Sequence, residues 1–128
     1  MSYLVTSDVD LDAAHAFLSR SYWSPGVSKE VLARAFAHSI CFSLRCDGAQ
    51  VGFARVISDR ATFAYLADVY VLEEHRGRGL ARRLLEAVHA HPELQSLRRW
   101  LLLTRDAHGL YRKLDWADAA PGRLMERK

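Results

Sequence analysis

Hydrophobic residues in the first third of the chain recur at the spacings of one strand and two helices. Residues 3–6 form a short β-prone run. The next apolar residues share one face of a helix that Ser7 or Asp8 can cap: Leu11, Ala14, Phe17 and Leu18. After a break at Pro25-Gly26, Ser28 can cap a second helix with the apolar face Val31, Leu32, Ala35 and Phe36.

Three extended runs follow these helices. The runs ICFSLRC (40–46) and QVGFARVIS (50–58) flank Asp47-Gly48, and Asp-Gly between two β-rich runs is a strong hairpin signal. A third run, ATFAYLADVYV (61–71), comes after a polar turn at residues 58–60. The pattern predicts three consecutive strands, of which the first two form a hairpin.

The remaining pattern is helix, strand, helix. An apolar stripe predicts a helix that ends at His91-Pro92 and carries Leu80, Leu84, Leu85 and Val88. Residues 100–103 are continuously apolar, which is typical of a central strand covered on both faces. Residues 104–116 predict a short helix with the inner face Ala107, Leu110, Tyr111 and Leu114. The tail GRLMERK (122–128) leaves room for one more edge strand.

The order of elements is therefore β-α-α-β-β-β-α-β-α-(β). It predicts an α/β (α+β) fold with a mixed, mostly antiparallel central sheet and helices on both faces. With 128 residues the chain is long enough for one hydrophobic core and too short for two. We expect a single domain spanning residues 1–128.

Composition and charge narrow the possible partners. Half of the residues are hydrophobic, and no apolar run approaches the roughly 20 residues that span a bilayer. The N-terminal stretch MSYLVTSDVD is acidic rather than typical of a signal peptide, so we expect a cytoplasmic protein without a membrane partner. The net charge of +3 is too small to indicate nucleic acid by itself. Cys41 and Cys46 lie in one predicted strand, too far apart for a disulfide.

A glycine-containing loop precedes the third predicted helix, in the stretch EEHRGRGLARRLLEAV (73–88). The first N–H groups of a helix lack internal partners and carry a partial positive charge, and glycines at 77 and 79 allow close approach to the backbone. With Arg76, Arg78 and Arg82 nearby, the loop suits a phosphate or pyrophosphate. A solvated basic turn is the alternative. The loop lacks the GK[ST] of a P-loop and the three-glycine dinucleotide motif.

Two motifs resemble those of the GNAT N-acetyltransferase superfamily. Arg76-x-x-Gly79-x-Ala81, after a strand, resembles its acetyl-CoA signature [QR]-x-x-G-x-[GA]. Residues 107–116 are similar to its A-x-x-x-Y-x-k-x-G-F segment, with Tyr111 at the tyrosine. Thr104 stands where the family often has asparagine, and Asp115 stands where it has glycine. The order of elements also matches, so the resemblance covers nearly the whole chain.

The resemblance implies acetyl-CoA as co-substrate. The strand containing Val69–Val71 would splay from the strand containing residues 101–103, and the pantetheine arm would fill the gap. One backbone amide there would polarise the thioester carbonyl. The cofactor-binding residues implied are Val69, Tyr70, Val71, Arg76, Gly77, Arg78, Gly79, Leu80, Ala81 and Arg82.

Two residues are candidates for proton transfer. Tyr111 matches the family's tyrosine that protonates the departing thiolate, and the alternative is a core tyrosine on an amphipathic helix. Asp68 is the only charged residue between Ala61 and Leu72. Burial would favour it as a general base, whereas an arginine or backbone amides could instead tie it down. A water chain could also replace it as base. The histidines are scattered, which argues against a metal site.

The substrate side is less specified by the sequence. In the family the acceptor docks against the first two helices and their loop, which here contains Tyr22 and Trp23. We expect direct acetyl transfer from acetyl-CoA to a primary amine. A non-catalytic acyl-CoA-binding or regulatory module of the same fold is the alternative. An arginine-loop nucleic-acid binder is a third interpretation, disfavoured by the absence of interleaved aromatic residues. The short C-terminus predicts either a truncated last hairpin or one completed in a homodimer.

Overall fold

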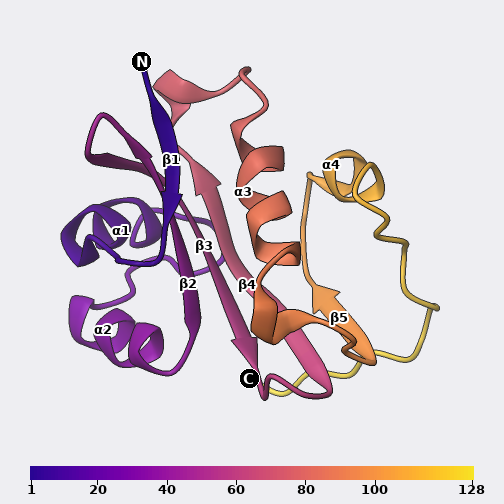
Figure 1. Cartoon of the computed structure of the whole chain (residues 1–128). Coiled ribbons are helices and arrows are strands. Elements are labelled where there is room, and N and C mark those ends of the chain that lie inside the picture. The colour runs from indigo at the N-terminus through magenta and orange to yellow at the C-terminus, as the bar shows by residue number, and fades with distance from the viewer.

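The computed structural model describes all residues, 1–128, as a five-stranded sheet between two helical layers (Figure 1). The strands are β1 Tyr3–Thr6, β2 Ile40–Cys46, β3 Ala49–Ser58, β4 Phe63–Val71 and β5 Arg99–Leu102. The helices are α1 Leu11–Leu18, α2 Lys29–Ala37, α3 Leu80–His89 and α4 His108–Arg112, with short 3-10 turns η1 Glu73–His75 and η2 Pro92–Leu94. The predicted order of elements is confirmed up to α4.

The sheet has the order β1-β2-β3-β4-β5, antiparallel except for the parallel pair β4–β5. The predicted hairpin is confirmed. Cys46 pairs with Ala49, and Asp47 and Gly48 both have positive φ, as the tight turn of a two-residue hairpin requires. The crossover from β4 through α3 to β5 brings the glycine loop to one end of the sheet (Figure 1).

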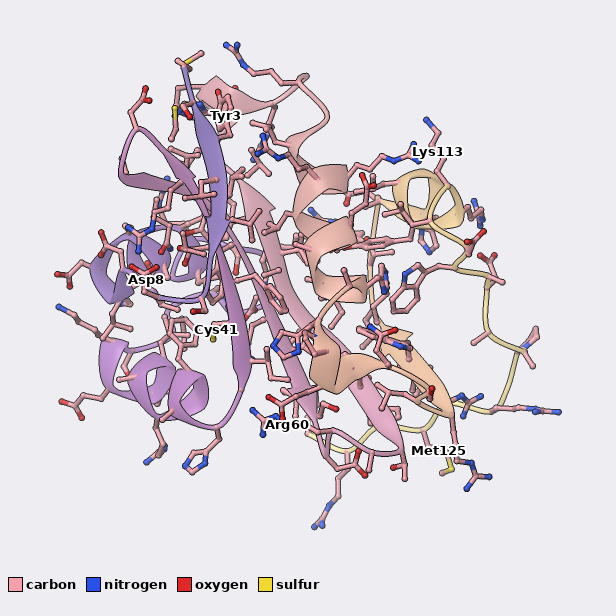
Figure 2. The ribbon with its side chains drawn as sticks, in the orientation of Figure 1. Tyr3, Asp8, Cys41, Arg60, Lys113 and Met125 are labelled. Atoms are coloured by element: carbon pink, nitrogen blue, oxygen red, sulfur yellow. The ribbon has the colours of Figure 1, made fainter.

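Two hydrophobic clusters hold the layers together. The larger lies between the sheet and α3, which buries Leu80, Leu84, Leu85 and Val88. The smaller joins the other face to α1 and α2, where Phe53 and Tyr70 meet Ala14, Leu18 and Leu32. Cys41, labelled in Figure 2, belongs to this second cluster, and both cysteines are buried and unpaired. The prediction of a mixed sheet with helices on both faces is confirmed.

A β-bulge interrupts β4 and positions the site. Arg55 pairs with Asp68, but the next residue of β3, Val56, pairs with Leu66, so Ala67 is an extra residue in β4. The bulge changes which side chains face which layer. Leu66 before it and Val69 after it both pack toward α3, although they are three positions apart in the strand. Pairing of β4 with β5 ends at Leu66–Leu102, beside the bulge.

Several predicted details differ from the structure. The run 100–103 is not a central strand, because β5 is the edge strand and its residues are half-buried or exposed. Residues 122–128 form no strand. They end a segment that leads from α4, next to Lys113, to the end of the molecule that carries Arg60 (Figure 2). Without a sixth strand the outer edge of β5 has no ladder partner within the chain.

The start of α1, the apolar face of α2 and the start of β4 also differ from the sequence prediction. Asp10, rather than Ser7 or Asp8, caps α1, and its side chain accepts from the Ala13 N–H at 3.0 Å. Ser28 caps α2 as predicted, but Val31 is 44% exposed and lies outside the apolar face. The third strand of the sequence prediction begins at Phe63, because Asp59 binds the backbone N–H groups of residues 61–63 in a tight turn. Every helix is too short or too polar to traverse a bilayer.

Candidate active site

The opening between β4 and β5 begins where their pairing stops. Backbone groups of successive strand residues point to opposite edges, and the N–H of Leu72 donates to the Val51 carbonyl on the β3 side at 2.8 Å. The amides and carbonyls of Val69 and Val71 therefore face the opening. This is the splay that the sequence resemblance implies, and it begins beside the bulge at Ala67.

The N-terminus of α3 lies at one end of this opening. No side chain caps it, its first turn contains no acidic residue, and Gly79 is the cap residue with φ 72°. A Cβ added at Gly77 or Gly79 would meet no atom within 4 Å, so the backbone is uncovered there. Intrahelical bonding starts at the Arg83 N–H, which leaves the N–H groups of Leu80, Ala81 and Arg82 directed outward. These features suit a diphosphate.

The arginines of the loop differ in their contacts. The Nε of Arg76 donates to the Val71 carbonyl at 2.9 Å, so this side chain ties the loop to the end of β4. Arg82 is exposed, and its Nε lies 3.6 Å from Glu86 one turn along α3. Arg78 is exposed and forms no ion pair. Of the three, Arg78 is therefore the arginine most available to an anion.

A cleft of about 610 Å³ continues from the opening toward α1 and α2. Its walls come from the α1–α2 loop, β3, β4, the β5–α4 loop and α4. Residues predicted at three separate places in the sequence line it together: Tyr22, Trp23, Asp68, Val69 and Tyr111. Its size is that of a small-molecule site.

Tyr111 is the buried aromatic residue of α4 and is 9% exposed. Its ring packs edge-on against Trp116, with ring centroids 5.9 Å apart. Burial raises the pKa of its hydroxyl to about 12, and the nearby Tyr22 phenol adds to the shift. The hydroxyl is therefore neutral near pH 7, which is the form that can donate a hydrogen bond.

Asp68 is buried, and both of its carboxylate oxygens are engaged. Its Oδ2 accepts from the Nε of Arg55 at 2.7 Å, and its Oδ1 accepts from the indole N–H of Trp23 at 2.7 Å. Arg55 also donates to Ser39 Oγ at 3.1 Å. This geometry matches the alternative considered from the sequence, in which an arginine forms an ion pair with the Asp68 carboxylate. Through Trp23, Asp68 also fixes the α1–α2 loop to β4.

The β5–α4 loop reaches the same α1–α2 loop from the other wall. The guanidinium of Arg105 lies over the Tyr22 ring, with its central carbon 3.9 Å from the ring centroid. The backbone N–H of Arg105 donates to the Tyr22 hydroxyl at 3.1 Å. Sequence reasoning did not single out Arg105, and no motif in the sequence would have shown this contact across 83 residues.

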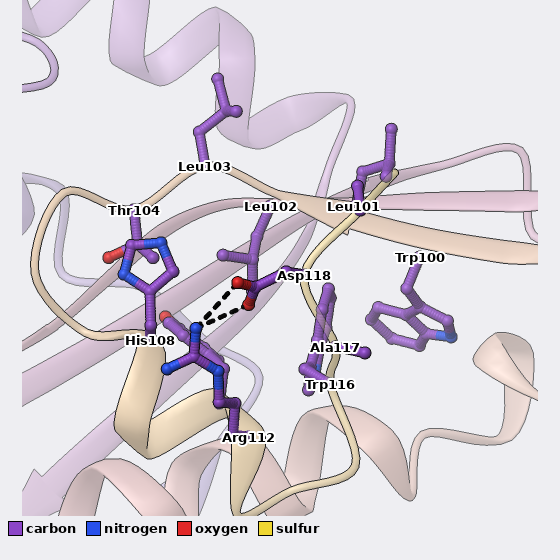
Figure 3. A pocket seen from close by; sticks show the side chains of 12 residues that line it. Trp100, Leu101, Leu102, Leu103, Thr104, His108, Arg112, Trp116, Ala117 and Asp118 are labelled. Carbon is purple, nitrogen blue, oxygen red and sulfur yellow. Dashed lines mark hydrogen bonds and ion pairs between the residues drawn. The ribbon is translucent and has the colours of Figure 1, made fainter. Parts of the chain in front are cut away.

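A second, smaller cavity of about 290 Å³ lies between β5, α4 and the segment after it (Figure 3). Trp100, Leu102, Tyr111 and Trp116 line it, and Arg112 closes one side through an ion pair with Asp118 at 2.7 Å (Figure 3). The Trp116 indole N–H donates to Nε2 of His89 on α3 at 3.1 Å. Burial lowers the pKa of His89, which keeps this ring in the neutral form that can accept.

The two departures from the family motif have different consequences. Thr104 Oγ1 accepts from the Ala107 N–H at 3.1 Å and so starts the turn into α4. Asp115 has φ 70°, in the left-handed region that favours glycine, which explains why the family motif carries glycine there. No group of three or more His, Cys, Asp or Glu side chains lies close enough together to hold a metal ion.

Comparison with known proteins identifies the class. Residues 37–118 match the model of the acetyltransferase (GNAT) domain. The chain belongs to the GNAT family of acetyltransferases, whose members use acetyl-CoA. The splayed strands, the uncapped α3 N-terminus and the cleft fit that co-substrate.

Individual relatives agree with this family. A protein of Xanthomonas campestris pv. campestris assigned to the GNAT acetyltransferases is 48% identical, with a TM-score of 0.95 over 100% of this chain and 94% of its own. A protein of Gibberella zeae that is assigned as an acetyltransferase is 36% identical to this chain, over 87% of this chain and 76% of the Gibberella protein. The L-2,4-diaminobutyric acid acetyltransferase of Halomonas elongata is 33% identical over 83% of this chain, which spans 52% of that enzyme.

Proposed function

We propose that the protein is an acetyl-CoA-dependent N-acetyltransferase that moves the acetyl group directly onto a primary amine. The observation that carries the proposal is the opening between β4 and β5, which begins where their pairing stops at Leu66–Leu102. The α3 N-terminus lies at one end of this opening, and the cleft lies at the other. The relative that acts on L-2,4-diaminobutyric acid, which is an amine, agrees with an amine acceptor.

The cofactor side would be held mainly by backbone. The amides of residues 77–82 would bind the diphosphate, with Arg78 and Arg82 adding charge and Arg76 holding the loop in place. The main chain of Val69 and Val71 would bind the pantetheine arm as an added strand, beside Tyr70, whose ring belongs to the opposite core. A backbone amide at the bulge would polarise the thioester carbonyl.

Tyr111 would supply the proton for the leaving group. The amine nitrogen forms a bond to the acetyl carbon, the carbon–sulfur bond breaks, and the sulfur leaves with the electron pair. Tyr111 lines the cleft, and its hydroxyl would donate its proton to that sulfur, while the attacking nitrogen would lose its proton to a base or to water.

Two roles are open for Asp68, and each has a structural basis. As a general base it would take the proton of the amine, directly or through water. As an anchor it would hold Trp23, and with it the substrate loop, against β4. Its two occupied oxygens favour the anchor, and a water chain then serves as base.

A screen of primary amines with a thiol-release readout tests the proposal. We expect release of CoA that depends on an amine and yields the N-acetyl product. Binding of acetyl-CoA without amine-dependent release from any acceptor would contradict the proposal and leave the non-catalytic acyl-CoA-binding module. A cytoplasmic location and a homodimer are further expectations, for which cell fractionation and light scattering are the direct measurements.

A further inference from the structure

The charges of the cleft are unequally available to a ligand. Four charged side chains line it: Arg55, Asp68, Arg105 and Asp106. Arg55 and Asp68 form a buried ion pair whose side chains are 15% and 5% exposed, so this pair is already neutralised within the protein. Arg105 and Asp106 are exposed, and neither takes part in an ion pair.

Arg105 is the better positioned of the two free charges. Its guanidinium is stacked on Tyr22, and its backbone N–H is bonded to the same tyrosine's hydroxyl. Stacking on a ring face leaves the N–H groups at the edge of the guanidinium free, and these match the two oxygens of a carboxylate. The Asp106 carboxylate makes no hydrogen bond that would hold it in one place.

The Tyr22 ring on which Arg105 stacks is itself held in place. Tyr22 is followed by Trp23, which donates to the buried Asp68, and the rings of Tyr22 and Trp23 pack edge-on with centroids 5.1 Å apart. The Tyr22 ring is therefore fixed to β4 through its neighbour. Arg105 is held at the wall of the cleft with little conformational entropy left to lose on binding an anion.

We infer that the acceptor is an amine that also bears a carboxylate, and that Arg105 binds this carboxylate. The inference rests on the proposed amine acetylation, because it assigns the acceptor of that same cleft. The aromatic residues Tyr22, Trp23 and Tyr65 supply the wall along which the rest of the acceptor lies. A diamine without an acidic group offers no partner for the Arg105 guanidinium.

Matched acceptor pairs that differ only in the carboxylate test this inference. The pairs are lysine and cadaverine, ornithine and putrescine, and phenylalanine and phenethylamine. We expect kcat/KM to favour the carboxylate-bearing member by about tenfold to a hundredfold, the scale of a hydrogen-bonded charge pair. Arg105→Gln should reduce that ratio to within about threefold. The control Arg98→Gln, which removes the same charge from an exposed residue outside the cleft, should keep the wild-type ratio.

The possible failures are distinguishable. If the wild type releases thiol but turns over the decarboxylated members equally well or better, the inference is overturned. The proposed amine acetylation is then unaffected. A preference for the carboxylate that survives Arg105→Gln would overturn the role of Arg105. A variant that raises the acetyl-CoA KM but keeps the ratio would place Arg105 on the co-substrate instead. Absence of amine-dependent thiol release in the wild type would overturn the proposed function and this inference together.

Discussion

Tyr111 connects the two cavities, because it lines both the cleft and the smaller cavity beside Trp116. Tyr111→Phe keeps the ring and its packing and removes only the hydroxyl. We expect kcat to fall by roughly 10²–10⁴, the scale for loss of a positioned general acid, with acetyl-CoA affinity and melting temperature nearly unchanged. Steady-state kinetics and thermal unfolding of the same variant give the result. Full turnover would contradict the assignment of Tyr111 as the acid.

The raised pKa of Tyr111 predicts how activity depends on pH. The neutral hydroxyl is the active form, and ionisation sets in only near the pKa of about 12. The pH profile of the wild type should therefore show no loss of activity from Tyr111 below about pH 11.

Asp68 has two candidate roles, general base and anchor of Trp23, and the contacts of its carboxylate favour the anchor. Asp68→Asn keeps the shape but weakens the contacts to Arg55 and Trp23, and Trp23→Phe removes the indole donor alone. For an anchor we expect both variants to raise the amine KM, a fall in stability of about 1–3 kcal/mol for Asp68→Asn, and an acidic limb that survives. For a general base, Asp68→Asn alone would abolish the acidic limb of kcat/KM.

Much of the site was predictable residue by residue, and the remainder depended on tertiary contacts. The sequence pattern indicated Gly79 and Asp68, and the family resemblance indicated Tyr111 within the same motif as Trp116. The two partners of Asp68 were not predictable as individual residues, because Trp23 reaches it across 45 residues of the sequence and Arg55 from the neighbouring strand. The Arg105–Tyr22 stack had no local signal at all.

At the scale of elements, the strongest local signals gave the right structure. Asp47-Gly48 forms the tight turn, and the apolar stripe of α3 is buried as predicted. The apolar run 100–103 was misinterpreted, because a half-buried edge strand over an aromatic cluster looks the same in sequence as a central strand. The bulge had no signal in the sequence, because apolar residues occupy both odd and even positions from 63 to 67. In the structure, the residues packed toward α3 change from Ala64 and Leu66 to Val69 and Val71.

The N-terminus of α3 gives a prediction at this scale. Gly79→Val adds a side chain on the uncovered backbone, so we expect the acetyl-CoA Kd to rise by about tenfold or more. Gly122→Val is a matched control, because Gly122 also has positive φ and open space around it but lies in the C-terminal segment. It carries the same backbone strain of about 1–2 kcal/mol and should leave the Kd unchanged. Equal Kd values for both variants in calorimetry would remove the anion-site interpretation.

At the scale of the whole molecule, one pH-sensitive contact joins the C-terminal segment to α3. His89 accepts from Trp116, and burial lowers its pKa below the ordinary value, whereas Asp115 acts in the opposite direction. The unfolded chain therefore binds a proton first as pH falls, so this contribution to stability is complete above about pH 6.5 and declines below it.

The contribution of His89 can be isolated with one variant. His89→Gln retains a hydrogen-bond acceptor for the indole and removes the titration. We expect the melting temperature of the wild type to fall more steeply between pH 7.5 and pH 5.5 than that of the variant, on the order of a few degrees. Parallel curves would show that His89 does not couple the segment to pH.

The central claim for the whole molecule is that one cleft carries acetyl transfer from acetyl-CoA directly to an amine. Mass spectrometry of both protein and amine during turnover of acetyl-CoA with an isotope-labelled acetyl group tests it most directly. We predict that the label appears on the amine nitrogen, that CoA is released in equal amount, and that the protein carries no label at any time. Label on the protein before it reaches the amine, or no labelled amine at all, would contradict the account.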